Sequence, residues 1–120
     1  MKITIPISVG ELLDKISILQ IKSKHTDNPH VSNELKTLTE IAKQKKVYDY
    51  FYISQLLDIN NSLWKIEDDL RELEKYQDFG DLFVKLARSV YKINDTRSLV
   101  KKEINEKYNS EYQEVKCYNV

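Results

Sequence analysis

Residues 56–73, LLDINNSLWKIEDDLREL, carry the pattern that decides the fold. Apolar residues recur here at alternating steps of three and four, the heptad spacing of a helix that packs against another helix. The spacing resumes after a short turn at 78–81, which contains one of the two glycines of the chain. We therefore predict two long helices, about 50–77 and 80–108, joined as an antiparallel hairpin. The predicted seam consists of Leu56, Ile59, Leu63, Ile66, Leu70 and Leu73 in the first helix, and of Leu82 or Phe83, Leu86, Val90, Ile93, Val100 and Ile104 in the second.

A first helix is predicted N-terminal to the hairpin. Ser8 and Glu11 form a capping-box signature, and an apolar stripe runs from there to about Lys24. Gly10 is a poor helix former in the first turn of this helix. It either allows another backbone to approach closely or is simply tolerated near the helix end.

A second helix follows the break at 25–28. Pro29 suits the first helical position, and the apolar stripe continues to about Lys45. The next segment, 47–53, is dense in aromatic residues and could be a strand by propensity. We favour a short turn that runs into the third helix, because the helical period begins at once. The aromatic side chains are expected to lie in the core or on an oligomer face.

The two ends of the chain alternate between apolar and polar residues. Residues 2–7, KITIPI, and residues 112–118, YQEVKCY, have the period of two that is typical of strands. Pro6 restricts the first to a sheet edge, and an isolated strand is not viable, so the two should pair. The predicted fold is mainly α: a single domain, 1–120, with a helical hairpin or bundle of about four helices and a small two-stranded β pair formed by the terminal segments.

Charge and composition exclude several classes of function. The chain has 19 basic and 19 acidic residues, so a bulk attraction to nucleic acid or to an anionic membrane is not expected. It contains no apolar run long enough for a membrane helix, no signal-peptide pattern and no phosphate-cradling glycine motif. The only cysteine, Cys117, cannot form an internal disulfide. We expect a cytoplasmic protein with no membrane insertion, no metal and no cofactor, for which nucleic acid is an unlikely partner.

The basic residues are unevenly divided between 16 lysines and three arginines. Lysine, asparagine, isoleucine and tyrosine have AT-rich codons and together make up 44 of the 120 residues, which indicates an AT-rich bacterial or phage source. Under such a bias lysine replaces arginine wherever only a positive charge is needed. The remaining arginines therefore indicate positions where the planar guanidinium group matters. All three arginines fall between 71 and 97.

Polar side chains on the two hairpin helices form a candidate ligand site. If the hairpin folds about residue 79, residue i faces residue 158 − i, and polar ridges on the two helices converge at its middle. Arginine forks, carboxylates, an amide, a phenol and an indole suit a planar or phosphorylated ligand. The candidate ligand-binding residues are Trp64, Glu67, Asp68, Arg71, Arg88, Tyr91, Asn94, Asp95 and Arg97.

A structural interpretation of the same residues stays open. Arg97 occupies a position where the seam calls for an apolar residue. It would then belong to a buried polar layer that fixes the helix register, paired with Glu67 or with the asparagines at 60–61.

Three segments of the chain resemble a family of uncharacterised proteins. They are IPISVGELLDKISIL at 5–19, LWKIEDDLR at 63–71 and LARSVYKINDTR at 86–97. They are similar to small bacterial and phage proteins encoded near surface-polysaccharide glycosyltransferase genes and sometimes fused to such proteins. The resemblance spans nearly the whole chain and implies no known activity.

Two functions follow as hypotheses. The first is a non-enzymatic interaction or accessory protein, with a role in envelope-polysaccharide synthesis that the resemblance implies. It would form a homodimer through the 47–53 segment and the edge strand, with a protein or a small anionic ligand as a further partner. The second is a binder or enzyme for a phosphorylated or sugar-nucleotide-like ligand, in which arginines hold the anion and a carboxylate acts as base. Carboxylates also occur in pairs three residues apart, as at Glu11 and Asp14 or Asp69 and Glu72, but the order of these pairs does not match the all-helical nucleotide pyrophosphatases.

Overall fold

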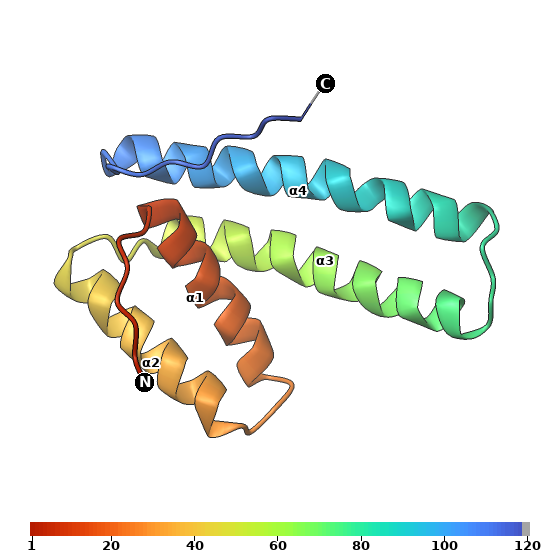
Figure 1. Ribbon diagram of the computed structural model, residues 1–120, viewed down its shortest axis with the longest axis horizontal. Coiled ribbons are helices and arrows are strands. Elements are labelled where there is room, and N and C mark those ends of the chain that lie inside the picture. The colour runs from red at the N-terminus through yellow and green to blue at the C-terminus, as the bar shows by residue number, and fades with distance from the viewer. Residues whose placement is uncertain (119–120) are drawn as a thin grey trace.

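The computed structural model describes residues 1–118, and four helices account for most of them. Each helix predicted from the sequence is present, and its ends lie within two residues of the predicted ones. A mainly α fold is therefore confirmed. The helices are α1 (Val9–Ser23), α2 (Pro29–Gln44), α3 (Tyr50–Lys75) and α4 (Asp81–Lys107), arranged as in Figure 1.

Helices α3 and α4 form the predicted antiparallel hairpin (Figure 1). Its open end is locked by Asp49, which caps α3 by accepting a hydrogen bond from the backbone N–H of Tyr52. Lys107 Nζ lies 2.7 Å from Asp49 Oδ2, and the Tyr108 hydroxyl donates to the same oxygen. These partners lie within two residues of the pairing that folding about residue 79 predicts, so the straight-hairpin register is confirmed.

Helix α1 is the centre of the molecule because it packs against each of the other three helices. The first turn begins as predicted, with Ser8 Oγ accepting a hydrogen bond from the backbone N–H of Glu11. The fully enclosed apolar side chains lie where α1 meets α2 and the open end of the hairpin. They are Leu13, Ile16, Ala42, Ile53, Leu56, Val100 and Ile104.

The closed half of the hairpin extends beyond this core as a two-helix arm (Figure 1), which we define as residues 63–94. No side chain within the arm is buried. Its seam residues are only half-buried, because each helix has a single neighbour there. Two-helix packing leaves the outer flanks of both seams in contact with solvent.

The predicted β pair is wrong: residues 1–118 contain no strand. Residues 112–118 instead fold back along α4 (Figure 1), where Glu114 pairs with Lys101 and Lys116 pairs with Asp95. Residues 2–7 leave the core in another direction, and Ile5 is exposed. Side-chain ion pairs therefore direct the tail onto α4, and a bare two-stranded pair offers too little burial to compete.

The aromatic segment 47–53 forms the predicted turn into α3 rather than a strand. Ile53 is fully buried, and Tyr52 packs against the core beside it. Tyr50 and Phe51 remain exposed at the start of α3. The segment therefore contributes to the core and also leaves an aromatic surface uncovered.

Gly10 lies where α1 meets α4. Its backbone N–H donates to Asn105 Oδ1 at 2.7 Å. A Cβ atom at this position would lie 2.7 Å from the carbonyl oxygen of Lys101 and 2.9 Å from Asn105 Oδ1. Of the two roles that the sequence leaves open, close backbone approach is therefore the one that the structure shows.

We expect Gly10→Ala to lower the free energy of unfolding by about 2 to 3 kcal/mol, because the added methyl group forces α1 away from α4. The control is Gly80→Ala, whose Cβ atom would meet only Asp78 Oδ1, at 3.3 Å. That variant should lose about 1 kcal/mol or less. Urea unfolding measures both, and equal losses would contradict the close approach.

Acid should weaken the interactions of Asp49 with Lys107 and Tyr108 at the open end of the hairpin. Burial alone would raise the pKa of Asp49, but hydrogen bonds from Lys107 and Tyr108 outweigh it and hold the pKa below its ordinary value of 3.8. A pKa that is lower in the folded state stabilises the fold above about pH 5, and this stabilisation is lost as the pH falls through 3.8 toward the folded value. In urea unfolding at about pH 6 and pH 3, Asp49→Asn should therefore lose less stability on acidification than the wild type. An equal loss in both proteins argues against the lock.

Candidate functional site

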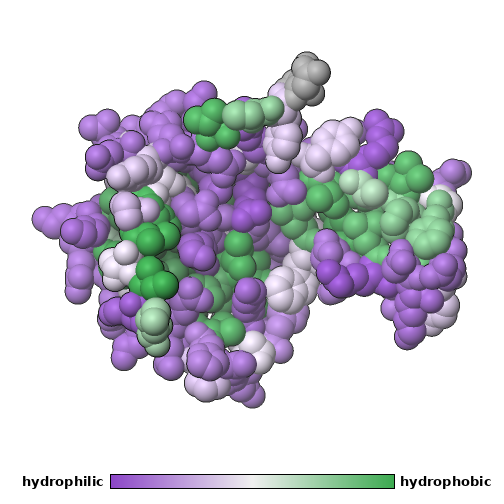
Figure 2. Space-filling model, in the orientation of Figure 1, coloured by the Kyte–Doolittle hydropathy of each residue, from purple (hydrophilic) through white to green (hydrophobic). Residues whose placement is uncertain are grey.

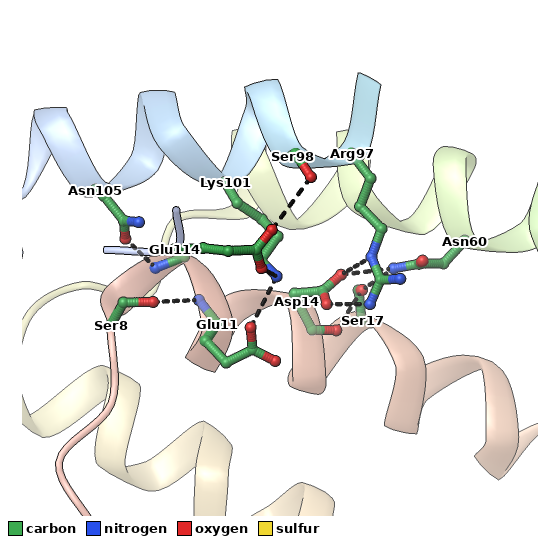
Figure 3. Close-up of polar contacts among 11 residues, drawn as sticks. Ser8, Glu11, Asp14, Ser17, Asn60, Arg97, Ser98, Lys101, Asn105 and Glu114 are labelled. Carbon is green, nitrogen blue, oxygen red and sulfur yellow. Dashed lines mark hydrogen bonds and ion pairs between the residues drawn. The ribbon is translucent and has the colours of Figure 1, made fainter. Parts of the chain in front are cut away.

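A buried polar layer joins three helices beside the core (Figure 3). The Asp14 side chain in α1 is fully buried and accepts two hydrogen bonds from the Arg97 guanidinium of α4. Arg97 Nε lies 3.0 Å from Asp14 Oδ1, and a terminal guanidinium nitrogen contacts Oδ2. From α3, Asn60 Nδ2 donates to Asp14 Oδ1 at 3.0 Å and to Ser17 Oγ at 2.9 Å.

The guanidinium of Arg97 is engaged within the chain. Its hydrogen bond with Asp14 raises the pKa of Arg97 above the ordinary value, against the opposing effect of burial. Only a quarter of its side chain is exposed. The arrangement is that of the register-fixing polar layer considered in the sequence analysis. Arg97 pairs with Asp14, however, and not with Glu67 or the asparagines as expected: Asn60 joins the layer through Asp14 and Ser17, and Glu67 pairs with Arg71 at 3.1 Å.

A second cluster lies one helical turn along α4 from Arg97. The buried Lys101 Nζ lies 2.7 Å from Glu11 Oε2 in α1 and 3.1 Å from Glu114 Oε2 in the tail (Figure 3). Burial lowers the pKa of Lys101, but the hydrogen bonds with both carboxylates outweigh this and raise it. The hydrogen bond from Lys101 holds the pKa of Glu114 below its ordinary value. One ammonium group therefore joins α1, α4 and the C-terminal tail.

A groove of about 410 Å³ opens beside the polar layer, between α1 and the hairpin. Five of the nine predicted site residues line it, together with four residues that were not among the predicted site residues. The indole of Trp64 stacks on the His25 ring, with centroids 4.6 Å apart and planes inclined by 14°. The predicted lining residues are Trp64, Glu67, Asp68, Arg71 and Arg97, and the additional ones are Ile18, Ile21, Asn60 and Leu63.

The other four predicted residues lie outside the groove lining. Tyr91 and Asp95 are exposed, and Lys116 of the tail pairs with Asp95 at 3.2 Å. Asn94 is half-buried, whereas Arg88 is exposed. The structure therefore brings the α3 ridge and Arg97 together, but it leaves most of the α4 ridge apart from them.

The charges of the groove are unfavourable for a simple anion site. Arg97 holds Asp14 and Arg71 holds Glu67, so each arginine of the groove already faces a carboxylate of the same chain. Asp68 forms no ion pair within residues 1–118. The groove can offer an aromatic face, an apolar floor and a weakly acidic rim.

The comparisons with known proteins agree with the whole-chain resemblance seen in the sequence. A family of unknown function, DUF6165, matches residues 1–120. The chain belongs to this family. No curated protein and no solved structure gave a match. The family assignment thus confirms membership of an uncharacterised family.

Two further observations concern metal binding and membrane crossing. Within residues 1–118 there is no group of three or more His, Cys, Asp or Glu side chains placed to hold a metal ion. None of α1 to α4 is long and apolar enough to cross a membrane.

The main partners of Arg97 and Lys101 were not among the predicted site residues. Asp14 and Ser17 interrupt the apolar stripe of α1 at a spacing of three, which places both on its buried side. Lys101 and Asn105 continue the positions of Arg97 along α4 in steps of four. Polar residues that recur inside an apolar stripe were the signal that could have identified this layer.

We expect Arg97→Met to lower the free energy of unfolding by about 3 to 5 kcal/mol, since it leaves the Asp14 carboxylate buried without its ionic partner. Arg97→Lys keeps the charge but loses the two-pronged geometry, and should lose about 1 to 2 kcal/mol. Arg88→Lys is the matched control and should change stability by less than about 0.5 kcal/mol. Chemical unfolding separates the three, and identical midpoints for Arg97→Lys and Arg88→Lys would contradict a structural role for the Arg97 fork.

Proposed function

We propose that the protein is a non-enzymatic interaction protein, an accessory of envelope-polysaccharide synthesis, and that its arm contacts the partner. The observation that carries this proposal concerns the side of the hairpin on which α1 packs. This side continues into the arm beyond the end of α1. Arg97 and Lys101 face α1. Steps of three and four back along α4 from them lead to Asn94, Tyr91 and further toward the turn, on the same side of the helix.

The α1-facing side of the arm is uncovered and partly apolar. Helix α1 ends at Ser23. His25, just beyond that end, stacks on Trp64 at the beginning of the arm. Beyond that point Tyr91 is 55% exposed and Val84 is 51% exposed. Figure 2 shows hydrophobic side chains continuing along the arm between its two helices. Contiguous exposed apolar surface of this kind is typical of protein–protein contact sites.

The genomic and cellular parts of the proposal rest on the sequence. The resemblance to proteins encoded near surface-polysaccharide glycosyltransferase genes supports a role in that synthesis, and the lysine-rich composition supports an AT-rich bacterial or phage source. A single cysteine supports a cytoplasmic location. The proposal includes a homodimer. Because residues 1–118 contain no edge strand, that dimer depends on the exposed Tyr50 and Phe51, and light scattering that gives the mass of one chain at micromolar concentration would contradict it.

A small-molecule binder is the second candidate. It is supported by the groove, whose size falls within the usual range for small ligands and whose lining includes Trp64, Glu67, Asp68, Arg71 and Arg97. A sugar nucleotide that raises the melting temperature of the wild type but not of Arg71→Met would favour this function over the first.

We expect deletion of the gene from its source strain to reduce envelope polysaccharide, and a plasmid copy of the wild-type gene to restore it. Tyr91→Lys, which places a charge on the uncovered side of the arm, should fail to restore it. The matched control is Leu99→Lys. Leu99 is 62% exposed but lies on the opposite side of α4, two residues from both Arg97 and Lys101. Colorimetric measurement of the polysaccharide distinguishes the strains.

Both variant proteins should melt within a few degrees of the wild type, because each changes an exposed side chain. Unchanged polysaccharide in the deletion strain contradicts the link to its synthesis. Full restoration by Tyr91→Lys contradicts a contact through this side of the arm.

A further inference from the structure

We propose that the groove beside the polar layer binds a nucleobase, a neutral planar ring that carries an N–H donor next to a hydrogen-bond acceptor. This inference rests on the second candidate of the proposed function, because it names the class of small molecule and the part of it that the groove recognises. Two features of the groove carry it. One is a free acceptor beside a free donor in the polar layer, and the other is an indole on the same side of α3.

The free acceptor is the side-chain oxygen of Asn60, a residue that is 6% exposed and lines the groove. Asn60 Nδ2 donates to Asp14 Oδ1 and to Ser17 Oγ, whose own hydrogen is donated to the backbone carbonyl of Asp14. Both partners accept, so the orientation of the amide is fixed. Within residues 1–118, Asn60 Oδ1 accepts no hydrogen bond, yet no buried side-chain nitrogen or oxygen there lacks a partner. The oxygen is therefore open to a molecule in the groove.

The free donor is the second terminal nitrogen of Arg97. Nε and Nη2 of Arg97 hold the Asp14 carboxylate, and Nη1 has no hydrogen-bond partner within residues 1–118. Arg97 Nε and Asn60 Nδ2 each lie 3.0 Å from Asp14 Oδ1, so the two groups are neighbours (Figure 3). A donor beside an acceptor is complementary to the hydrogen-bonding edge of a nucleobase, which carries the same pair in the reverse order.

The indole of Trp64 provides a surface on which a planar ring can stack. Trp64 follows Asn60 by four residues and so lies one turn along the same side of α3. One face of the indole is covered by the nearly parallel His25 ring. Trp64 lines the groove and His25 does not, which leaves the other face for a ring in the groove. Hydrogen bonds to the edge of a base, combined with stacking on an aromatic side chain, are the usual means by which proteins hold a single base.

The charges of the groove favour a neutral ring over a phosphate. Arg71 is paired with Glu67, and Arg97 is paired with Asp14. Asp68 adds a carboxylate that has no ion pair in the described part of the chain. No positive charge is therefore left unpaired in the lining to hold a phosphate group.

The apolar part of the lining favours a base over a sugar. It consists of Ile18, Ile21 and Leu63. A sugar ring carries hydroxyl groups around its whole circumference, and those placed against apolar side chains would lose their hydrogen bonds to water. A base can direct its polar edge to the free donor and acceptor while its faces contact the indole and the apolar side chains.

The probes for the test are adenosine, guanosine, cytidine and uridine. The matched control for each is the same nucleoside with the N–H groups of its hydrogen-bonding edge replaced by N–methyl groups. Ribose alone and excess inorganic phosphate test the sugar and the anion. All are titrated into the full-length protein and followed by calorimetry and by the emission of Trp64, the only tryptophan of the chain.

At least one nucleoside should bind saturably, change Trp64 emission and bind at least tenfold more tightly than its methylated control. Ribose should not bind, and phosphate should not displace the nucleoside. By calorimetry, Trp64→Leu should weaken nucleoside binding tenfold or more, because the stacking surface is lost. Tyr91→Leu changes an exposed aromatic residue outside the groove lining and should leave binding within twofold of the wild type. Melting temperatures check that both variants fold, and the methylated controls decide the question if Trp64→Leu does not.

Four outcomes would overturn the inference: no binding of any nucleoside, equal binding of the methylated controls, displacement by phosphate, or wild-type affinity in a folded Trp64→Leu variant. The second candidate function is tested separately. If no nucleoside binds but a sugar nucleotide still raises the melting temperature of the wild type and not that of Arg71→Met, the nucleobase inference fails and the small-molecule function stands.

Discussion

The rest of the structure depends on the buried pair between Asp14 and Arg97. A carboxylate removed from water requires a cation and further hydrogen bonds, and Arg97 and Asn60 supply them from two different helices. The observed position of α1 on the hairpin satisfies all of these groups at once. Within residues 1–118, no buried side-chain nitrogen or oxygen lacks a hydrogen-bond partner. The pair therefore selects the position of α1, and the position of α1 determines where the groove opens and where the arm begins.

Most of the fold could be predicted from the sequence because it is encoded locally. Caps such as Ser8 and Asp49, together with apolar residues at helical spacing, set the helix ends and the hairpin register. The terminal β pair could not be predicted correctly, since alternation at 112–118 does not reveal which surface the segment meets. In the structure, Lys101 of α4 pairs with Glu114 of that segment and holds it on the helix. This is a tertiary interaction, which the local alternation does not encode.

The candidate site was only partly predictable for a related reason. Hairpin geometry places Trp64 and Arg71 on one ridge of α3, and both line the groove. It does not reveal that α1 lies beside that ridge, so Ile18 and Ile21 could not be foreseen as its opposite wall. The partner of Arg97 was missed because Asp14 lies 83 residues away in the sequence. Local spacing marks Asp14 as a polar residue on the buried side of α1, but it does not identify which residue of another helix is its partner.

The start of α1 and the end of α4 meet, and this contact has a consequence for the topology of the protein. The backbone N–H of Val9 donates to Ser110 Oγ at 3.1 Å, close to where Lys101 joins Glu11 and Glu114. The polypeptide thus nearly closes into a ring, with the arm tip at 76–80 diametrically opposite the closure (Figure 1). Such a chain is suited to circular permutation, in which a short linker joins Ser110 to Val9 in place of the two terminal segments and new ends are opened at the tip. The permuted protein would retain the polar layer and the core while presenting α3 and α4 as two separate terminal helices.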